Sequence, residues 1–136
     1  MKKTICICTF LLFTLSGFTQ VVDSAAVVRE VDSLIKEAKI LYNKKQYKEM
    51  VEIVGIAQQL TIERFGKENE IYIRNLNYLA VARKNLKEHE EAEKVYLECI
   101  NFSKQILIKP GKEYADCLQN LANLYLEVNR SLEAEP

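Results

Sequence analysis

The stretch LNYLAVARKNLKEHEEAEK at residues 76–94 recurs in related form 42 residues later, as LQNLANLYLEVNRSLEAEP at residues 118–136. The two stretches align without a gap and are identical at six of nineteen positions. When the chain is written in rows of 42, earlier residues join the same columns. The aligned columns include Leu34 with Leu76 and Leu118, Ala38 with Ala80 and Ala122, and Glu49 with Glu91 and Glu133. A period of this length indicates a chain built from repeated supersecondary units.

Each row predicts two helices joined by a polar break. The first helix carries apolar residues at helical spacing, as at Leu118, Leu121 and Tyr125. The second, longer helix is expected over about residues 47–65 in the first row and 89–107 in the second. Polar breaks are predicted at 43–46, 86–88 and 129–130, and looser links at 65–70 and 108–113, where glycine and proline interrupt helices.

The last residues of the chain resemble the start of another second helix. SLEAEP at residues 131–136 follows the break at 129–130, and Pro136 suits the first turn of a helix. The rest of such a helix would cover the apolar side of the helix expected over residues 120–128. We therefore expect either that the chain is the N-terminal piece of a longer array, or that its exposed edge is covered by self-association.

Stacked hairpins are the fold that this anatomy predicts. A two-helix hairpin cannot bury its apolar face alone, so neighbouring hairpins must pack together. We expect an all-α fold, a right-handed α-solenoid of stacked antiparallel helix hairpins with about two and a half units. Small residues at Ala38, Ala80 and Ala122 let the helices of a hairpin approach closely. The expected organisation is a linker and helix start at 20–32 and an array at 33–136, with units at about 34–75, 76–117 and 118–136, the last incomplete.

The repeat resembles the tetratricopeptide repeat (TPR), in the 42-residue form found in kinesin light chains and many bacterial proteins. The pattern of that form, L-N-N-L-A-x-L-Y-x-x-x-G-x-Y-x-E-A-E-P-L-Y, is similar to LNYLAVARKNLKEHEEAEKVY at 76–96 and to residues 118–136. LIKEAKILYNKKQYKEMVEI at 34–53 is more divergent, with Met50 in place of the small alanine. Departures at the turn are Lys45, Lys87 and Asn129, where the family prefers glycine, and His89 and Ser131, where it prefers tyrosine.

The resemblance implies a concave groove, lined by the first helix of each unit, that holds extended peptides. Carried over by motif, the candidate groove residues are Lys39, Asn43, Arg74, Asn77, Tyr78, Asn85, Gln119, Asn120 and Asn123. Asn120 matches the second asparagine of the family motif, whereas Tyr78 and Lys36 depart from it. An asparagine amide suits peptide binding because it both donates and accepts hydrogen bonds. The alternative is that these residues are simply the polar side chains of a solvated face.

We therefore predict a non-enzymatic protein–protein interaction module that binds a peptide or protein partner in this groove. The alternative is an N-terminal regulatory or sensing segment of a longer TPR protein with a C-terminal effector domain, either a caspase-like CHAT peptidase or a signalling output. No catalytic constellation, metal site or cofactor is predicted. His89 stands alone as the single histidine, and EHEEAEK at 88–94 is typical of a solvated helix start.

The N-terminal sequence MKKTICICTFLLFTLSGFTQ is typical of a secretory signal peptide. Lys2 and Lys3 precede an apolar run over residues 5–15, which is followed by small and polar residues. We expect a signal peptide at 1–19, cleaved before Gln20, and a secreted or periplasmic protein. An uncleaved N-terminal segment that anchors the chain in the inner membrane is the alternative.

Charge and cysteine content limit the partners and the compartment. Lys and Arg number 19 and Asp and Glu number 19, so no basic surface is expected to recruit nucleic acid. An oxidising destination would permit a disulfide between Cys99 and Cys117. Both cysteines lie in predicted helices, where a free thiol usually behaves as a small buried apolar side chain. The sequence leaves both possibilities open.

Overall fold

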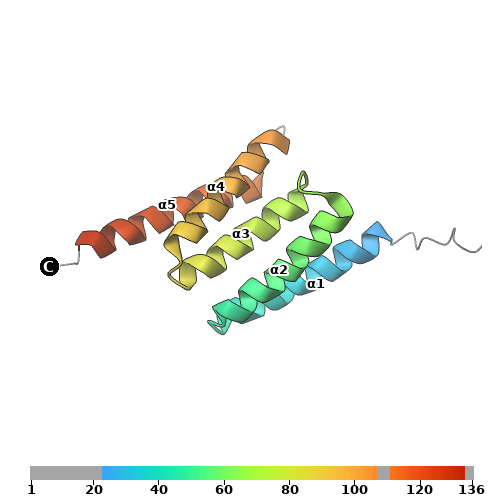
Figure 1. Cartoon of the computed structure of the whole chain (residues 1–136), viewed down its shortest axis with the longest axis horizontal. Helices are drawn as coiled ribbons and strands as arrows, with labels where there is room; N and C mark the ends of the chain where they lie inside the picture. The colour runs from blue at the N-terminus through green and yellow to red at the C-terminus, as the bar shows by residue number, and fades with distance from the viewer. Residues whose placement is uncertain (1–22, 107–110, 134–136) are drawn as a thin grey trace, which may run out of the picture.

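A computed structural model describes residues 23–106 and 111–133 of the chain, and in these ranges it contains helices and no strand. The helices are α1 (Ser24–Asn43), α2 (Tyr47–Phe65), α3 (Glu70–Asn85), α4 (His89–Ile106) and α5 (Lys112–Glu133) (Figure 1). The prediction of an all-α fold is confirmed. The predicted signal peptide, residues 108–110 of the link at 108–113 and the last three residues lie outside the described ranges.

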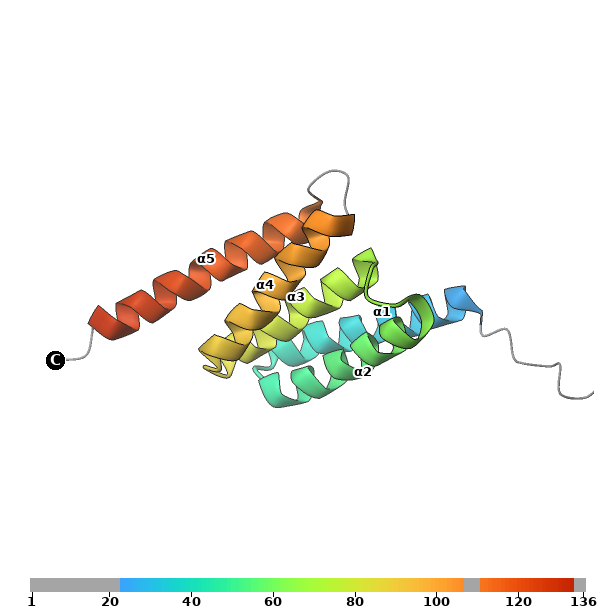
Figure 2. The same ribbon diagram turned by 45° about the horizontal axis from the view of Figure 1, so that its top comes forward.

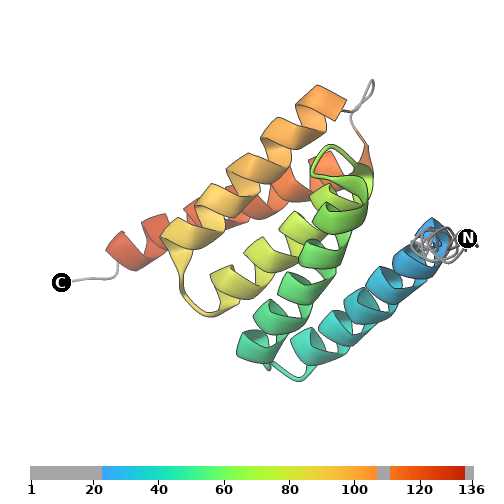
Figure 3. The same ribbon diagram turned by 45° about the vertical axis from the view of Figure 1, so that its right-hand side comes forward.

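The helices form two antiparallel hairpins and one further helix. α1 pairs with α2 and α3 pairs with α4, while α2 packs against α3 and α4 packs against α5 (Figure 1). The first helices of successive units also touch, since α3 contacts both α1 and α5. Figure 3 shows α1 and α5 at opposite edges of the array. Each helix therefore packs mainly against its neighbours in the sequence, with α5 as the last element described.

The two hairpin turns have the same backbone conformation. Lys45 has φ 59° and Lys87 has φ 65°, and these two residues are one 42-residue period apart. The amide of Lys45 donates to the carbonyl of Tyr42, and the amide of Lys87 donates to that of Lys84, both at 3.0 Å. A left-handed backbone is the conformation that favours glycine, yet lysine occupies this position in both turns. The breaks predicted at 43–46 and 86–88 are confirmed.

α1 begins at Ser24, inside the stretch 20–32 expected to hold a linker and helix start. The carboxylate of Asp23 accepts a hydrogen bond of 3.0 Å from the amide of Ala25 and caps the helix. The buried side chains of α1 then follow at helical spacing, at Val27, Val31, Ile35 and Ala38. The helix thus begins at Ser24, next to its Asp23 cap and one turn before Val27, the first buried residue of its apolar stripe.

The core repeats with the period of the sequence. The buried residues of α2 are Met50, Val54, Ala57 and Thr61, and their equivalents 42 residues later are the buried Ala92, Tyr96, Cys99 and Ser103 of α4. The polar pair keeps its hydrogen bond as well. The Thr61 hydroxyl donates to the Ala57 carbonyl at 2.7 Å, and the Ser103 hydroxyl donates to the Cys99 carbonyl at 2.8 Å. Equivalent residues therefore occupy equivalent environments in the two hairpins.

The third row departs from this pattern. A break was predicted at 129–130, with a new helix opening after it, and this prediction is wrong: α5 continues as one helix to Glu133. Ala38 and Ala80 are fully buried inside their hairpins, as expected, but Ala122 is exposed. α3 and α4 pack against the buried side of α5, and within the described ranges no helix lies against the side that holds Ala122.

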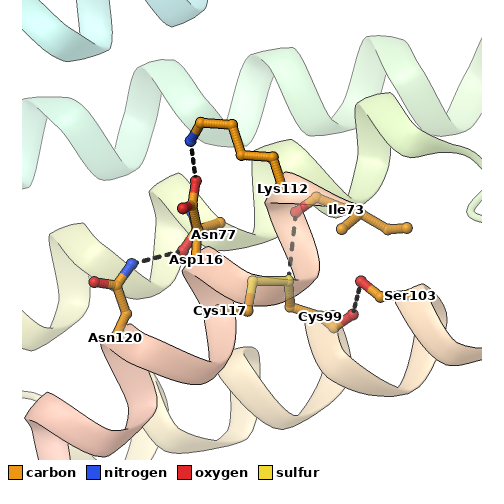
Figure 4. Close-up of a disulfide and its surroundings, with 8 residues drawn as sticks. All are labelled: Ile73, Asn77, Cys99, Ser103, Lys112, Asp116, Cys117 and Asn120. Carbon is orange, nitrogen blue, oxygen red and sulfur yellow. Dashed lines mark hydrogen bonds and ion pairs between the residues drawn. A yellow bond between two sulfur atoms is a disulfide. The ribbon is translucent and has the colours of Figure 1, made fainter. Parts of the chain in front are cut away.

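The joints between successive hairpins use two different bonds, which start from one shared position of the repeat and reach different partner positions. Where α3 meets α2, the buried Asn75 side chain donates a hydrogen bond of 3.0 Å to the Thr61 hydroxyl. One period later Asn75 is replaced by Cys117, which forms a disulfide with Cys99 of α4 across a Cα–Cα distance of 6.6 Å (Figure 4). Both cysteines are fully buried. The pairing that the sequence left open is thus present and ties α5 to α4.

Candidate functional site

A pocket of about 420 Å³ lies where the first helices of the three rows converge. Its lining comes from α1, α3 and α5, with one residue from the start of α2. The lining residues are Lys39, Tyr42, Asn43, Met50, Asn77, Tyr78, Val81, Asp116 and Asn120. The volume is within the range of about 300–1,000 Å³ that ligand pockets usually occupy.

Asn77 and Asn120 form the polar side of this pocket. The Asn120 amide nitrogen donates a hydrogen bond of 3.1 Å to the Asn77 amide oxygen, across the contact between α5 and α3 (Figure 4). Both side chains are half-buried. Each amide keeps donor and acceptor capacity beyond this one bond, because an asparagine amide has two N–H donors and an oxygen with two lone pairs.

An aromatic ring and a cation also line the pocket. The Lys39 ammonium lies 5.6 Å from the centroid of the Tyr78 ring, so α1 and α3 are joined here by a cation–π contact. At an exposed site such a contact contributes about 0.5–1 kcal/mol. The apolar part of the lining comes from Met50 and Val81, together with the ring of Tyr42. The pocket thus combines an apolar patch with amides and one cation.

Asp116 is the only carboxylate among the residues that line the pocket, and it forms an ion pair with Lys112, one turn earlier in α5 (Figure 4). The hydrogen bond to Asp116 raises the pKa of the Lys112 ammonium. Both groups are near the surface, so this pair adds little to stability. Its consequence is local: the carboxylate is partly neutralised, and the charges around the pocket nearly balance.

Five of the nine predicted groove residues lie in this pocket, and four do not. Arg74 instead pairs with Asp32 of α1, with 2.6 Å between its guanidinium and the carboxylate. Asn85 donates to the carbonyl of Val81 at 2.8 Å, near the end of its own helix. Gln119 and Asn123 are exposed and do not line the pocket. Helical spacing alone did not separate the face of α5 that meets α3 from the faces beside it.

Sequence reasoning missed four of the lining residues. Tyr42 and Val81 are aromatic and apolar, so their residue types do not distinguish them from core positions. Met50 was noticed only as an unusual replacement for alanine, and its longer side chain is what reaches the pocket from α2. Asp116 precedes Asn120 by one helical turn, so the spacing of the best candidate could have identified it.

The described residues contain no group of three or more His, Cys, Asp or Glu side chains placed to hold a metal ion. His89 begins α4 and lies in a surface hollow with its sequence neighbours Lys87, Glu88, Glu90 and Glu91. In the part of the chain that the structure describes, no helix combines the length and the apolar character needed to cross a bilayer. Comparison of the chain with protein-family models, with curated proteins and with solved structures gives no match.

Proposed function

We propose that this chain is a non-enzymatic TPR-like interaction module, and that it binds a peptide or a peptide segment of a protein in the pocket between α1, α3 and α5. The proposal includes the right-handed solenoid arrangement that the 42-residue period predicts. The observation that carries it is the pocket itself. Residues chosen from three different rows of the sequence, Lys39, Asn77, Tyr78 and Asn120 among them, line one cavity.

The chemistry of the lining favours an uncharged segment of extended peptide. The amides of Asn77 and Asn120 can pair with the N–H and C=O groups of a ligand backbone, which are present whatever its sequence. Met50 and Val81 would hold one apolar side chain of the ligand beside them. Since Asp116 pairs with Lys112 and Lys39 faces an aromatic ring, a strongly charged ligand finds little to neutralise it. Specificity would then come from the shape of the apolar part.

The Cys99–Cys117 disulfide supports the expected export of the protein. Disulfides persist in oxidising compartments and are rare where the glutathione pool keeps thiols reduced. A buried pair that joins two helices is typical of a structural disulfide. We therefore include a secreted or periplasmic location in the proposal, as the N-terminal sequence predicts.

The test begins with selection of linear peptides from a random phage-displayed library on the immobilised full chain. The affinity of a selected peptide is then measured by fluorescence anisotropy for wild type, Asn120→Ala and Asn123→Ala. The two variants carry the same substitution on the same helix, three residues apart, but only Asn120 lines the pocket. We expect Asn120→Ala to weaken binding about tenfold, which corresponds to about 1.4 kcal/mol, and Asn123→Ala to leave it unchanged.

Two results would count against this proposal. One is a library that yields no peptide above background on the folded chain. The other is a peptide whose affinity falls equally in both variants, which would place its site outside the pocket. Circular dichroism on each variant ensures that a loss of helix is not mistaken for a loss of binding.

A further inference from the structure

α5 carries a stripe of exposed residues on the side that faces away from α3 and α4. Its buried residues, Cys117, Leu121 and Leu124, lie on the opposite side and pack into the core. The exposed stripe has the spacing of a helix face that packs against another helix. Its members are Ala115, Leu118, Gln119, Ala122, Tyr125, Leu126 and Asn129, and each of them is exposed.

The same face is covered in the preceding hairpin. Leu76 and Ala80 of α3, one period before Leu118 and Ala122, are buried in the core that α3 and α4 share. Leu76 is 1% exposed whereas Leu118 is 41% exposed. On α3 this face therefore packs against an antiparallel helix, and the equivalent face of α5 can accommodate one in the same way. In the part of the chain that the structure describes, no helix occupies that place on α5.

The stripe carries no charged residue. Of the charged side chains on α5 that the structure describes, Asp116 pairs with Lys112 and Glu127 pairs with Lys87. The Tyr125 hydroxyl donates a hydrogen bond of 2.6 Å to Glu93 of α4, which fixes the ring at the border of the stripe. A nucleic acid or another highly charged ligand would find no complementary charge here. The chemistry favours an uncharged, partly apolar helix.

The stripe is also symmetric about its small central residue. Taking Ala122 as the centre, Leu118 and Leu126 lie four residues away on either side. Gln119 and Tyr125 lie three residues away, and Ala115 and Asn129 lie seven away. An antiparallel copy of the same helix therefore sets Leu118 against Leu126, Gln119 against Tyr125 and Ala115 against Asn129, with Ala122 against Ala122 at the point of closest approach.

We propose that the α5 face is the interface of a homodimer, in which two copies of this chain pair their α5 helices antiparallel across a two-fold axis near Ala122. A two-fold interface requires one patch that is complementary to itself, and the arrangement around Ala122 satisfies this requirement. α5 of the partner subunit takes the place that α4 takes on α3. The Cys99–Cys117 disulfide holds α5 on the core, so the face is presented as a rigid surface.

The size of the stripe predicts a reversible dimer. From residue 115 to residue 129 it runs for about 21 Å at about 1.5 Å per residue. One helix face of this length is smaller than the roughly 800 Å² per partner of a standard interface. Leu97 adds apolar surface nearby, since it is exposed and follows Glu93 by one turn of α4. We expect a dissociation constant on the order of micromolar, at the weak end of specific association.

Sedimentation equilibrium on the full chain, from low to high micromolar concentration, tests this dimer. The variant Leu118→Lys/Leu126→Lys sets like charges opposite each other twice across the axis. The variant Leu118→Glu/Leu126→Lys sets opposite charges there instead. Ile56→Lys is the matched control, because Ile56 of α2 is 50% exposed, close to the 55% of Leu126, but lies outside the stripe.

We expect wild type and Ile56→Lys to dimerise alike. Leu118→Lys/Leu126→Lys should weaken the dimer at least about 100-fold, and Leu118→Glu/Leu126→Lys should regain at least about tenfold of that loss, in a salt-dependent way. A wild-type chain that stays monomeric throughout overturns the proposal even if no variant folds. Equal dissociation of the two double variants overturns the antiparallel register, and dissociation of Ile56→Lys shows association through other surfaces.

Discussion

At the scale of single residues, the two hairpin turns show a local conflict between sequence and backbone. Lys45 and Lys87 both adopt positive φ values, where a side chain crowds the backbone. This conformation costs roughly 1–2 kcal/mol for a residue other than glycine or asparagine. The hairpins form nevertheless, because burial of their helix faces outweighs the strain at one turn residue. The turns are consequently sites where the chain could be made more stable.

Replacing Lys45 by glycine should raise the free energy of unfolding by about 0.5–1 kcal/mol. Relief of the strained turn exceeds the entropy that glycine adds to the unfolded chain. The control is Lys44→Gly, one residue earlier, where φ is −83° and ψ is −2°. Glycine at position 44 relieves no backbone strain, so it should lower the free energy of unfolding by about 0.5–1 kcal/mol. Urea denaturation of the two variants checks the opposite signs, and a loss of stability in both would contradict this explanation of the turn.

At the scale of helices, the joints decide how one hairpin sits on the next. The α2–α3 joint uses the bond between Asn75 and Thr61, and the α4–α5 joint uses the disulfide of Cys99 with Cys117. The disulfide closes a short loop, with a sequence separation of 18. A loop of that size contributes about 3 kcal/mol in the chain-entropy description. α5 has this covalent attachment in addition to the packing of one of its faces.

The equivalence of the joints predicts that a second disulfide can be built. Ala57 and Asn75 lie one period before Cys99 and Cys117, so the variant Ala57→Cys/Asn75→Cys should form a bond between α2 and α3. We expect a net gain of about 1–2 kcal/mol, because about 3 kcal/mol from loop closure is offset by the lost Asn75 hydrogen bond. Peptide mapping under non-reducing conditions, with urea denaturation, provides the measurement.

The control for this disulfide is Ala57→Cys/Asn77→Cys, since Asn77 lies on the pocket side of α3. That pair should stay reduced. If it formed as readily as the first pair, or if the first pair remained as free thiols, the two joints would not be equivalent in geometry.

At the scale of the whole molecule, the core consists of two clusters of buried side chains, one around α1 and α2 and one around α3, α4 and α5. The second contains two buried tyrosines. Burial raises the pKa of Tyr72, with a further rise from its hydrogen bond to Glu98, and burial likewise raises the pKa of Tyr96. The Tyr96 hydroxyl is buried and has no hydrogen-bond partner in the described part of the chain.

These shifts predict a loss of stability at alkaline pH. Their contribution is fully present below the unfolded tyrosine pKa of about 10 and declines as the pH rises above it, because the unfolded chain loses the protons first. Each tyrosine adds a slope of up to about 1.4 kcal/mol per pH unit. Tyr96→Phe should remove one such slope and leave stability at neutral pH unchanged or slightly higher, since it deletes an unpaired hydroxyl. Denaturation of both proteins from neutral to alkaline pH compares the slopes, and parallel curves would contradict the prediction.

Much of the fold followed from periodic patterns in the sequence. The all-α class, the start of the second helices at Tyr47 and His89, and the breaks at 43–46 and 86–88 were predicted from helical spacing and polar interruptions. These features could be predicted because the same pattern of apolar and polar residues recurs in successive rows of the sequence. The break predicted at 129–130 is wrong: neither Asn129 nor Arg130 is a glycine or a proline, and α5 stays helical through both.

The candidate site was predictable in part. The polar members Lys39, Asn43, Asn77 and Asn120, with the aromatic Tyr78, were identified from their places in the repeat. The remainder depended on side-chain reach across helices, as with Met50, and on competing partners, as with Arg74, which pairs with Asp32 instead of lining the pocket. The spacing of residues predicts which face of a helix a side chain lies on, but it does not predict which neighbouring side chain it will bind.

By itself the sequence determined the helical class, the 42-residue period and the alanines that face inward in the first two rows, because these depend on local spacing and on the burial of apolar side chains. The tertiary structure alone decided that Cys99 and Cys117 pair, which residues share the pocket, and that the Ala122 face of α5 stays open. Each of these outcomes depends on how two or more helices pack together, which the sequence pattern of a single helix does not specify.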